Sequence, residues 1–288
     1  MSTPRSRQTR NDPTQTVGPY GRVRVVVTNY CNLRCRYCFN EGYPSRGRVF
    51  ASVALIRRRI AELSFRPSGI KLTGGEPFAH PKLEVIAAAL EEVAPVTVTT
   101  NGMFLGMNFE KLPSTVLVTV SVFGTNSSEF SAYTRRPKHD FDVFERQLHV
   151  VRSCPQRFAA NVLVRPGSAW QLERYVEYCA ARGFRLVRFL TLIGPEKIVP
   201  SYLTNLARVR RFFSARGAKA SGDDTSVVEI PYGQQRLQLL DQYTDLGEEY
   251  LRKFGYVWLG PLGEFYSVTR WSRLKDGGDD MTKGATSR

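Results

Sequence analysis

Residues 28–40 decide the interpretation of this chain; they read Thr-Asn-Tyr-Cys-Asn-Leu-Arg-Cys-Arg-Tyr-Cys-Phe-Asn. The cysteines are Cys31, Cys35 and Cys38, and their spacing is C-x-x-x-C-x-x-C. Three thiolates this close together can hold three irons of a [4Fe–4S] cubane and leave the fourth iron open to a small molecule. A structural zinc site needs four closed ligands, and no fourth Cys or His lies near in the sequence. We therefore predict one cluster, held by these three cysteines.

Two further motifs follow in order. Thr73-Gly74-Gly75-Glu76-Pro77 comes after the apolar run 69–72, and Thr99-Thr100-Asn101-Gly102 comes after the run 96–98. Together with the cysteine spacing, they resemble the radical S-adenosylmethionine (radical SAM) superfamily. A zinc-binding or redox cysteine cluster is the alternative interpretation of the same cysteines.

The resemblance implies the cofactors and their contacts. The cluster passes one electron to the sulfonium of S-adenosylmethionine (SAM), and the resulting 5′-deoxyadenosyl radical abstracts a hydrogen atom from the substrate. Gly74, Gly75 and Glu76 would hold the methionine amino group. The other implied cofactor contacts are Tyr37 against the adenine, Ser121, Thr99, Thr100 and Asn101 near the carboxylate or ribose, Asn161 with Arg165, and Ile193 in an apolar turn beside the adenine. The electron donor implied is of the flavodoxin or ferredoxin type.

Composition sets outer limits on function. The chain has 288 residues and a formal net charge of +15. Such a charge favours binding of anionic partners. The alternative is that the arginine side chains only cover solvent-exposed faces of helices. No apolar run reaches eighteen residues, so we expect no membrane span. Five cysteines, three of them clustered, fit a reducing cytoplasm better than a disulfide framework. We find no arginine- and glycine-rich arm, and do not expect nucleic acid as a partner.

Hydrophobic periodicity predicts alternating strands and helices. The expected strands are 23–28, 70–73, 96–100, 115–123, 158–165 and 185–191, and the expected helices include 53–63, 83–93, a segment around 144–151, and 168–182 capped by Ser168. Pro81 is expected at the first position of the second helix. Six such units predict a parallel sheet, and the resemblance implies a (β/α)₆ partial barrel.

The chain is expected to divide into four parts. Residues 1–20 form a disordered tail, 21–200 the partial barrel, 201–274 a small α+β extension covering the barrel, and 275–288 a polar tail. Within the extension we expect a basic helix at 203–216, a loop at 218–225, a strand at 227–230, a helix at 234–254, and a hairpin joining 256–259 to 265–268.

The period of two along strands places polar side chains on one face of each predicted strand. In parallel barrels the site lies at the carboxyl ends of the strands. Three cations fall on strands that line this chamber, and we predict that they bind an anionic substrate: Lys71, Arg165 and Arg188. No catalytic residue can be assigned from the sequence.

The run of residues 31–42 is similar to the branch that contains the molybdopterin-pathway GTP cyclase. The chain departs from that enzyme because it lacks a C-terminal three-cysteine cluster, which argues against molybdopterin synthesis itself. No cysteine follows Cys179, and Cys154 and Cys179 are interpreted as small buried side chains. We therefore expect a redox-neutral rearrangement, cyclisation, epimerisation or elimination of a small polar metabolite: a nucleotide, sugar or amino acid. Modification of a peptide or RNA, and a non-catalytic metal-binding role, are the alternatives.

Overall fold

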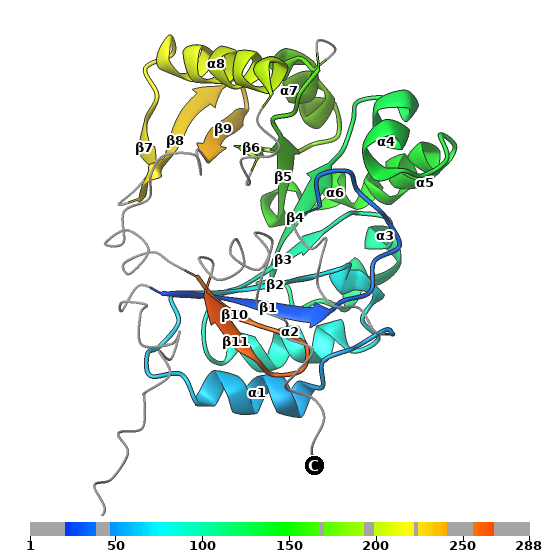
Figure 1. Cartoon of the computed structure of the whole chain (residues 1–288), viewed down its shortest axis with the longest axis vertical. Helices are drawn as coiled ribbons and strands as arrows, with labels where there is room; N and C mark the ends of the chain where they lie inside the picture. Colours follow the sequence, from blue (N-terminus) through cyan, green and yellow to red (C-terminus); the bar gives the residue numbers. More distant parts are fainter. Residues whose placement is uncertain are drawn as a thin grey trace, which may run out of the picture.

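The computed structural model describes residues 21–38, 47–167, 170–192, 199–221, 224–240 and 256–267. Its centre is a run of six parallel strands that neighbour one another in chain order (Figure 1). They are β1 (Arg22–Thr28), β2 (Gly69–Gly74), β3 (Val96–Thr100), β4 (Leu117–Val122), β5 (Phe158–Leu163) and β6 (Leu186–Leu190). The predicted (β/α)₆ arrangement is thus confirmed, because each β-branched run pairs with the next through a helical crossover.

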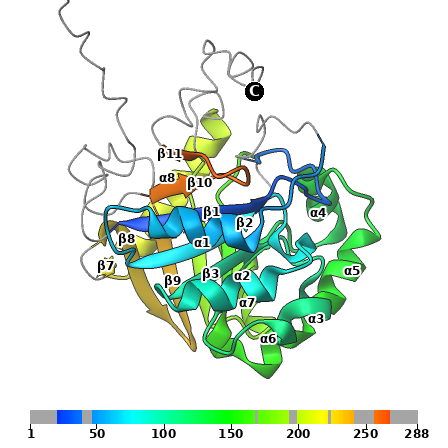
Figure 2. The same ribbon diagram turned by 90° about the horizontal axis from the view of Figure 1, so that it is seen from below.

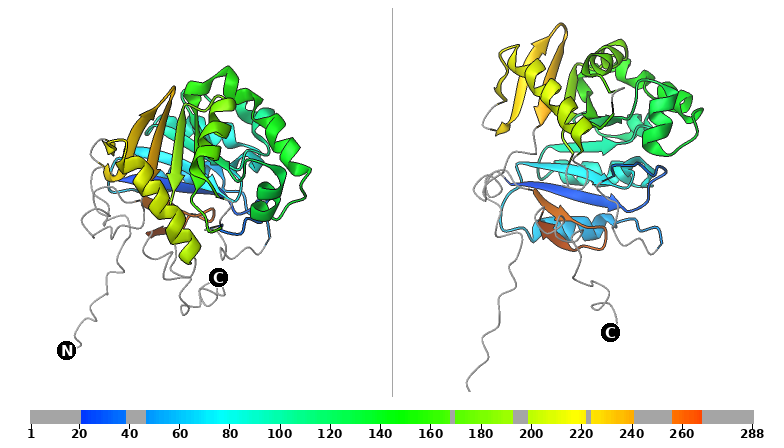
Figure 3. Two further views of the ribbon diagram at one scale, coloured as in Figure 1. Left: turned by 90° about the horizontal axis from the view of Figure 1, so that it is seen from above. Right: turned by 45° about the horizontal axis from the view of Figure 1, so that its top comes forward.

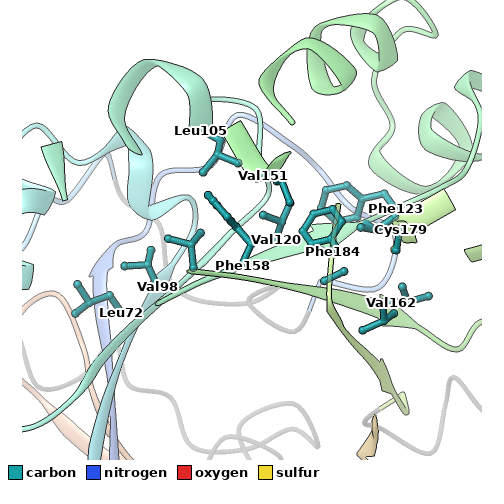
Figure 4. Packing of buried hydrophobic residues seen from close by; sticks show 14 of the residues in the cluster. Leu72, Val98, Leu105, Val120, Phe123, Val151, Phe158, Val162, Cys179 and Phe184 are labelled. Carbon is teal, nitrogen blue, oxygen red and sulfur yellow. The ribbon is translucent and has the colours of Figure 1, made fainter. Parts of the chain in front are cut away.

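Helices cover the outer face of this sheet (Figure 2). They are α1 (Val53–Ala61), α2 (Leu83–Glu91), α3 (Leu105–Asn108), α4 (Ser127–Thr134), α5 (Asp140–Gln147), α6 (His149–Ser153) and α7 (Leu172–Ala181), with short 3₁₀ turns η2 (Pro77–Ala79), η3 (Phe109–Lys111) and η4 (Pro155–Arg157). The apolar core lies between these helices and the sheet (Figure 4). Leu72, Val98 and Val118 hold it at matching register positions on β2, β3 and β4.

Several helix boundaries differ from the prediction. The predicted single helix around 144–151 is two helices, α5 and α6, which meet at Leu148. Helix α7 begins at Leu172 after an N-cap at Gln171, later than predicted, and Ser168 lies outside the described residues. Pro81 lies two residues before α2. Helix α4 was not predicted, because Phe130, Tyr133 and Thr134 are its only buried residues and give a weak helical period.

The extension adds strands at both edges of the sheet (Figure 3). After α8 (Pro200–Ser214) come β7 (Lys219–Ser221), β8 (Asp224–Tyr232) and β9 (Gln235–Leu240), and β9 pairs parallel with β6. The hairpin of β10 (Tyr256–Leu259) and β11 (Phe265–Ser267) is confirmed, and β10 pairs parallel with β1. The extension therefore lengthens the sheet at both edges, and its role as a cover over the barrel stays a prediction.

Two expectations for the extension are wrong. Residues 219–221 and 224–232 form strands where we predicted a loop with one short strand, and residues 235–240 form β9 where we predicted a helix. Alternation in 235–240 is visible in the burial of Gln235, Leu237 and Leu239, and it marks a strand rather than a helix. The rest of that predicted helix, 241–254, lies outside the described residues. No helix in the described part of the chain is long and apolar enough to cross a membrane.

Candidate active site

The cysteine loop begins directly after β1, and the carboxyl end of α4 anchors it. Cys31, Cys35 and Cys38 are all partly buried. The amide of Arg34 donates to the carbonyl of Thr134 at 3.2 Å, and the amide of Arg36 donates to that of Tyr133 at 2.8 Å. The last carbonyls of a helix have no partner within the helix, so they are free to hold a loop in this way.

The turn after β2 explains the two glycines of the second motif. A Cβ on Gly74 would lie 2.3 Å from the carbonyl oxygen of Thr28, and one on Gly75 would lie 2.1 Å from that of Tyr30. The amides of Gly75 and Glu76 donate to these same two carbonyls, each at 2.7 Å. Only residues without a side chain permit so close an approach, so the turn and the start of the cysteine loop form one unit.

Glu76 is fully buried, and its carboxylate points into the protein. It accepts hydrogen bonds from the Thr100 hydroxyl at 2.6 Å, the Asn101 amide at 2.7 Å and the Phe78 amide at 3.0 Å. Burial raises the pKa of this carboxyl to about 7, against the three hydrogen bonds that favour its ionised form. We expected this carboxylate to contact the methionine amino group. Its observed partners join the ends of β2 and β3, and the contact with the methionine amino group stays a prediction.

Asn101 connects the end of β3 to the cysteine loop. Its side-chain nitrogen Nδ2 donates to Asn32 Oδ1 at 2.7 Å and lies 3.7 Å from the sulfur of Cys31. Its side-chain oxygen Oδ1 accepts a hydrogen bond from the backbone N–H of Met103. Burial raises the pKa of the Cys31 thiol to about 11. A metal ligand must be the thiolate, so deprotonation here requires a bound cation such as iron.

Polar side chains line the inner face of the sheet in two rows. On one side Arg24, Lys71 and Thr97 occupy matching positions on β1, β2 and β3. On the other side Ser121, Asn161 and Arg188 occupy matching positions on β4, β5 and β6. The sheet therefore brings Lys71 and Arg188 to its inner face, as predicted.

Arg188 is held in place by side chains on both sides. Its Nη1 donates to the hydroxyl of Thr119 at 3.3 Å, and its Nε donates to Gln238 Oε1 at 3.1 Å. Sequence reasoning missed Arg24 and Gln238. The alternation of Arg22, Arg24 and the valines around them could have identified Arg24, whereas Gln238 lay within a segment that we predicted to be helical.

Two buried oxygens on this inner face have no hydrogen-bond partner among the described residues: Thr99 Oγ1 and Asn161 Oδ1. An unpaired buried polar atom is costly, so its presence next to a predicted cofactor site indicates that a ligand supplies the partner. These two oxygens, the cysteine loop and the glycine turn fit a cluster and SAM. They belong to β3 and β5, and both residues were predicted as cofactor contacts.

Arg165 follows β5 and contacts aromatic side chains. Its guanidinium lies 4.9 Å from the ring of Tyr133, and it donates to the hydroxyl of Tyr175, which lies 3.3 Å from Glu129 Oε2. Tyr133 also packs against the ring of Tyr37, with 5.9 Å between centroids. Tyr37 and Arg165 are thus linked through Tyr133, and Ile193 lies outside the described residues.

The arrangement does not suit a closed metal-ion site. Across the residues that the structure describes, no group of three or more His, Cys, Asp or Glu side chains has the geometry to hold a single metal ion. A cubane spreads its cysteine ligands around a larger body, and the partly buried cysteines on one loop suit that arrangement. Parallel strands, a three-cysteine loop after the first strand and a polar inner face define a SAM-dependent iron–sulfur enzyme of the partial-barrel type.

Comparison with known proteins agrees with this class. The chain belongs to the Radical SAM superfamily, which matches residues 25–179. A probable GTP 3′,8-cyclase of Archaeoglobus fulgidus is 38% identical over 109 residues, covering 36% of each chain. The GTP 3′,8-cyclase of Mycolicibacterium smegmatis is 32% identical over 190 residues, covering 59% of this chain and 51% of that protein. The chain thus spans about half the length, or less, of these curated relatives.

Solved structures show the same fold at low identity. Streptococcus suis SuiB bound to its precursor peptide SuiA has a TM-score of 0.60 and 14% identity, covering 92% of this chain and 66% of SuiB. The same enzyme bound to S-adenosylmethionine has a TM-score of 0.58 and 13% identity, covering 92% and 65%. The chain is therefore an enzyme whose cofactors are a [4Fe–4S] cluster and SAM, and the non-catalytic alternative is set aside.

Proposed function

We propose that this enzyme carries out a redox-neutral reaction on a small anionic metabolite, with a nucleotide as the first candidate. The observation that carries the proposal is the set of cations on the inner face of the sheet. Arg24 and Lys71 are register neighbours on β1 and β2, and Arg188 faces the chamber from β6. Cations placed on both halves of the inner face of the sheet favour a ligand with phosphate or carboxylate groups.

The neighbours of these cations are consistent with an anion site. Arg188 keeps contacts with Thr119 and Gln238, both of them neutral, and Arg24 lies 4.9 Å from the ring of Trp258. Glu229, on β8, accepts a hydrogen bond from Gln238 at 2.8 Å. These contacts fix the side chains of Arg188 and Arg24 on the inner face of the sheet.

The residues proposed to hold the cofactors surround the same chamber. Cys31, Cys35 and Cys38 would bind the cluster. The backbone of residues 74–76 and the oxygens of Thr99 and Asn161 would receive SAM, with Ser121 beside Asn161 in register. When bound, the cluster and SAM together supply the radical that removes a hydrogen atom from the substrate. The chain's own contribution is to hold both ligands and to shield them behind a polar, partly buried wall.

The remaining cysteines support the redox-neutral part of the proposal. Cys179 is fully buried in α7, and burial raises its pKa far above the usual range. Cys154 is partly buried beyond α6 and lies 3.6 Å from the carbonyl of Val150. Such buried thiols behave as small apolar side chains, and a second cluster built on this pair has no support.

The relatives narrow the substrate class without naming the substrate. The curated relatives named above are GTP 3′,8-cyclases, which supports a nucleotide, but this chain spans only about half of their length. A peptide substrate is the second candidate, and SuiB bound to its precursor peptide shares the fold alone. We further propose a flavodoxin- or ferredoxin-type electron donor and a cytoplasmic location, the latter supported by free cysteines.

A labelling experiment tests this proposal. The anaerobically reconstituted enzyme is incubated with SAM, dithionite and deuterium-labelled nucleoside triphosphates, with labelled sugar phosphates and amino acids as further candidates. We expect deuterium in 5′-deoxyadenosine with one anionic candidate, and at least tenfold less in Arg188→Ala than in the surface control Arg57→Ala. Labelling from a peptide library, with none from any anionic metabolite, would overturn the proposal.

A further inference from the structure

The surface around the cysteine loop is strongly basic. Arg34 and Arg36 lie between the cluster cysteines, and both side chains are exposed. Arg135, Arg136 and Lys138, which follow α4, are exposed as well. We call these five residues the cluster-side basic surface. The backbone joins its two halves, because the amides of Arg34 and Arg36 donate to the carbonyls of Thr134 and Tyr133.

Among the described residues near it in the sequence, few acids balance this surface. Asp140 is buried and accepts a hydrogen bond from Arg136 Nε at 2.6 Å, with His139 at 3.2 Å from its other oxygen. Asp142, on α5, is the exposed acid nearby in the sequence. Glu129 on α4 is mostly buried and pairs with Arg174 at 3.2 Å, away from the surface. Five cations against these acids leave a positive field on this side of the molecule.

The backbone at this surface is fixed. Arg135 ends α4 in the left-handed conformation, with φ +57° and ψ +33°, and its amide donates to the Ser131 carbonyl. The ring of Tyr37, next to Cys38, packs on the ring of Tyr133 within α4. The cysteine loop and the carboxyl end of α4 are therefore held against each other, and Figure 1 shows the blue segment after β1 running toward α4.

We propose that the cluster-side basic surface docks the electron donor, a small acidic protein that carries a flavin or an iron–sulfur group. This inference rests on the proposed function, which requires one electron per turnover from outside the chain. The reduced donor loses one electron and the cluster gains it, and no bond or proton moves in this chain. A donor docked here would contact the loop that carries the cluster ligands themselves.

The charge and the position of the surface together identify this occupant. Complementary charge accelerates the encounter of two proteins, by about 10- to 1000-fold at low salt. Electron transfer slows steeply with distance, so a docking surface for a donor is useful only next to the cluster. A second basic surface on α8, with Arg208 and Arg211 exposed beside a cavity of about 390 Å³, has the charge but lies on another part of the molecule (Figure 1).

The α8 surface provides a matched control. The variant Arg34→Glu/Lys138→Glu and the control Arg208→Glu/Arg211→Glu change the net charge equally. Binding of oxidised, FMN-loaded flavodoxin to the reconstituted enzyme is measured by flavin fluorescence at several salt concentrations. We expect the first variant to weaken binding about tenfold or more and to flatten its salt dependence, with less than a twofold change in the control.

Rates of SAM cleavage then separate this proposal from the proposed function. With reduced flavodoxin as donor, the rate in Arg34→Glu/Lys138→Glu should fall about tenfold, while the rate with dithionite stays as in the wild type. No cleavage with dithionite in the wild type would contradict the proposed function instead. If Arg34→Glu disturbs cluster assembly, as shown by iron content, then Arg135→Asn/Lys138→Glu makes the same test outside the cysteine loop. Equal loss of flavodoxin binding in the α8 control, or no loss in either basic-surface variant, would overturn the docking proposal.

Discussion

The carboxylate of Glu76, after β2, accepts the backbone N–H of Asn101, after β3, at 2.7 Å. The side chain of Asn101 in turn donates a hydrogen bond to Asn32, which lies between the first two cluster cysteines. Three motifs that are far apart in the sequence are thus joined by side-chain and backbone hydrogen bonds. Glu76 therefore positions the turn of residues 74–76 relative to β3 and the cysteine loop.

Replacement of Glu76 by Ala should destabilise the protein. Two amides and one hydroxyl lose a buried acceptor, and we expect a loss of about 3 kcal/mol in the free energy of unfolding, measured by urea denaturation. SAM affinity should fall as well, because the turn of residues 74–76 loses its tie to β3. Glu62→Ala is the control, because Glu62 is an exposed acid in surface ion pairs with Arg58 and Arg59 and should cost less than about 1 kcal/mol. Equal stability of the two variants would contradict this role.

The raised pKa of Glu76 predicts how stability depends on pH. Burial raises this pKa from 4.5 to about 7, so the folded chain holds the proton more tightly than the unfolded chain. The favourable contribution is complete below pH 4.5 and is lost as the pH rises through about 7, on the order of 3 kcal/mol in total. Glu76→Gln is neutral throughout. The unfolding free energy of Glu76→Gln should therefore rise relative to that of the wild type between about pH 5 and about pH 8. A difference in unfolding free energy that stays constant over this range would show that the pKa of Glu76 is not raised.

Gly75→Ala should prevent normal cluster assembly. The new Cβ would lie 2.1 Å from the Tyr30 carbonyl oxygen and 2.8 Å from the Cys31 amide nitrogen, so the cysteine loop must move. Iron content after anaerobic reconstitution measures the effect, and we expect less than half of the wild-type value. Gly69→Ala, at the start of β2, is the control, because its Cβ would meet only the Pro95 carbonyl at an ordinary 3.7 Å. Full iron content in Gly75→Ala would show that the close approach is not needed.

Thr99→Val separates stability from cofactor binding. The hydroxyl oxygen of Thr99 is buried and has no partner in the part of the chain that the structure describes. Its removal should therefore leave the free protein as stable as the wild type or more stable by about 1 kcal/mol. If SAM supplies the missing partner, its affinity should fall about fivefold or more, measured by equilibrium binding. Thr115→Val, at an exposed hydroxyl paired with Glu91, should leave SAM affinity unchanged. Normal SAM affinity in Thr99→Val would show that Thr99 does not contact SAM.

The six strands and the cysteine loop could be predicted because each signal is local. The runs of valine in β1 and the glycines of the second motif fix backbone conformation over a few residues. The inner-face positions of Lys71 and Arg188 also follow, because side chains alternate along a strand. The predicted strand ends agree with the observed ones to within two residues, and Arg165 lies beyond the end of β5.

The missed features depend on contacts between distant segments. Nothing in residues 127–134 shows that the carbonyls of Tyr133 and Thr134 hold the cysteine loop, and the direction of the Glu76 carboxylate depends on Thr100 and Asn101. Gln238 could be placed beside Arg188 only once β9 was known to pair with β6. At each of these positions the structure depends on tertiary contacts, which local sequence signals do not report.

The most direct test of the account is the iron content and the SAM cleavage of the anaerobically reconstituted chain. We predict about four irons per chain, no zinc, and reductant-dependent release of methionine and 5′-deoxyadenosine. Replacement of Cys31, Cys35 and Cys38 by Ala should abolish both the iron and the cleavage, whereas replacement of Cys154 and Cys179 by Ala should leave about four irons. About eight irons in the wild type, or zinc in place of iron, would contradict the single cluster on which the whole account rests.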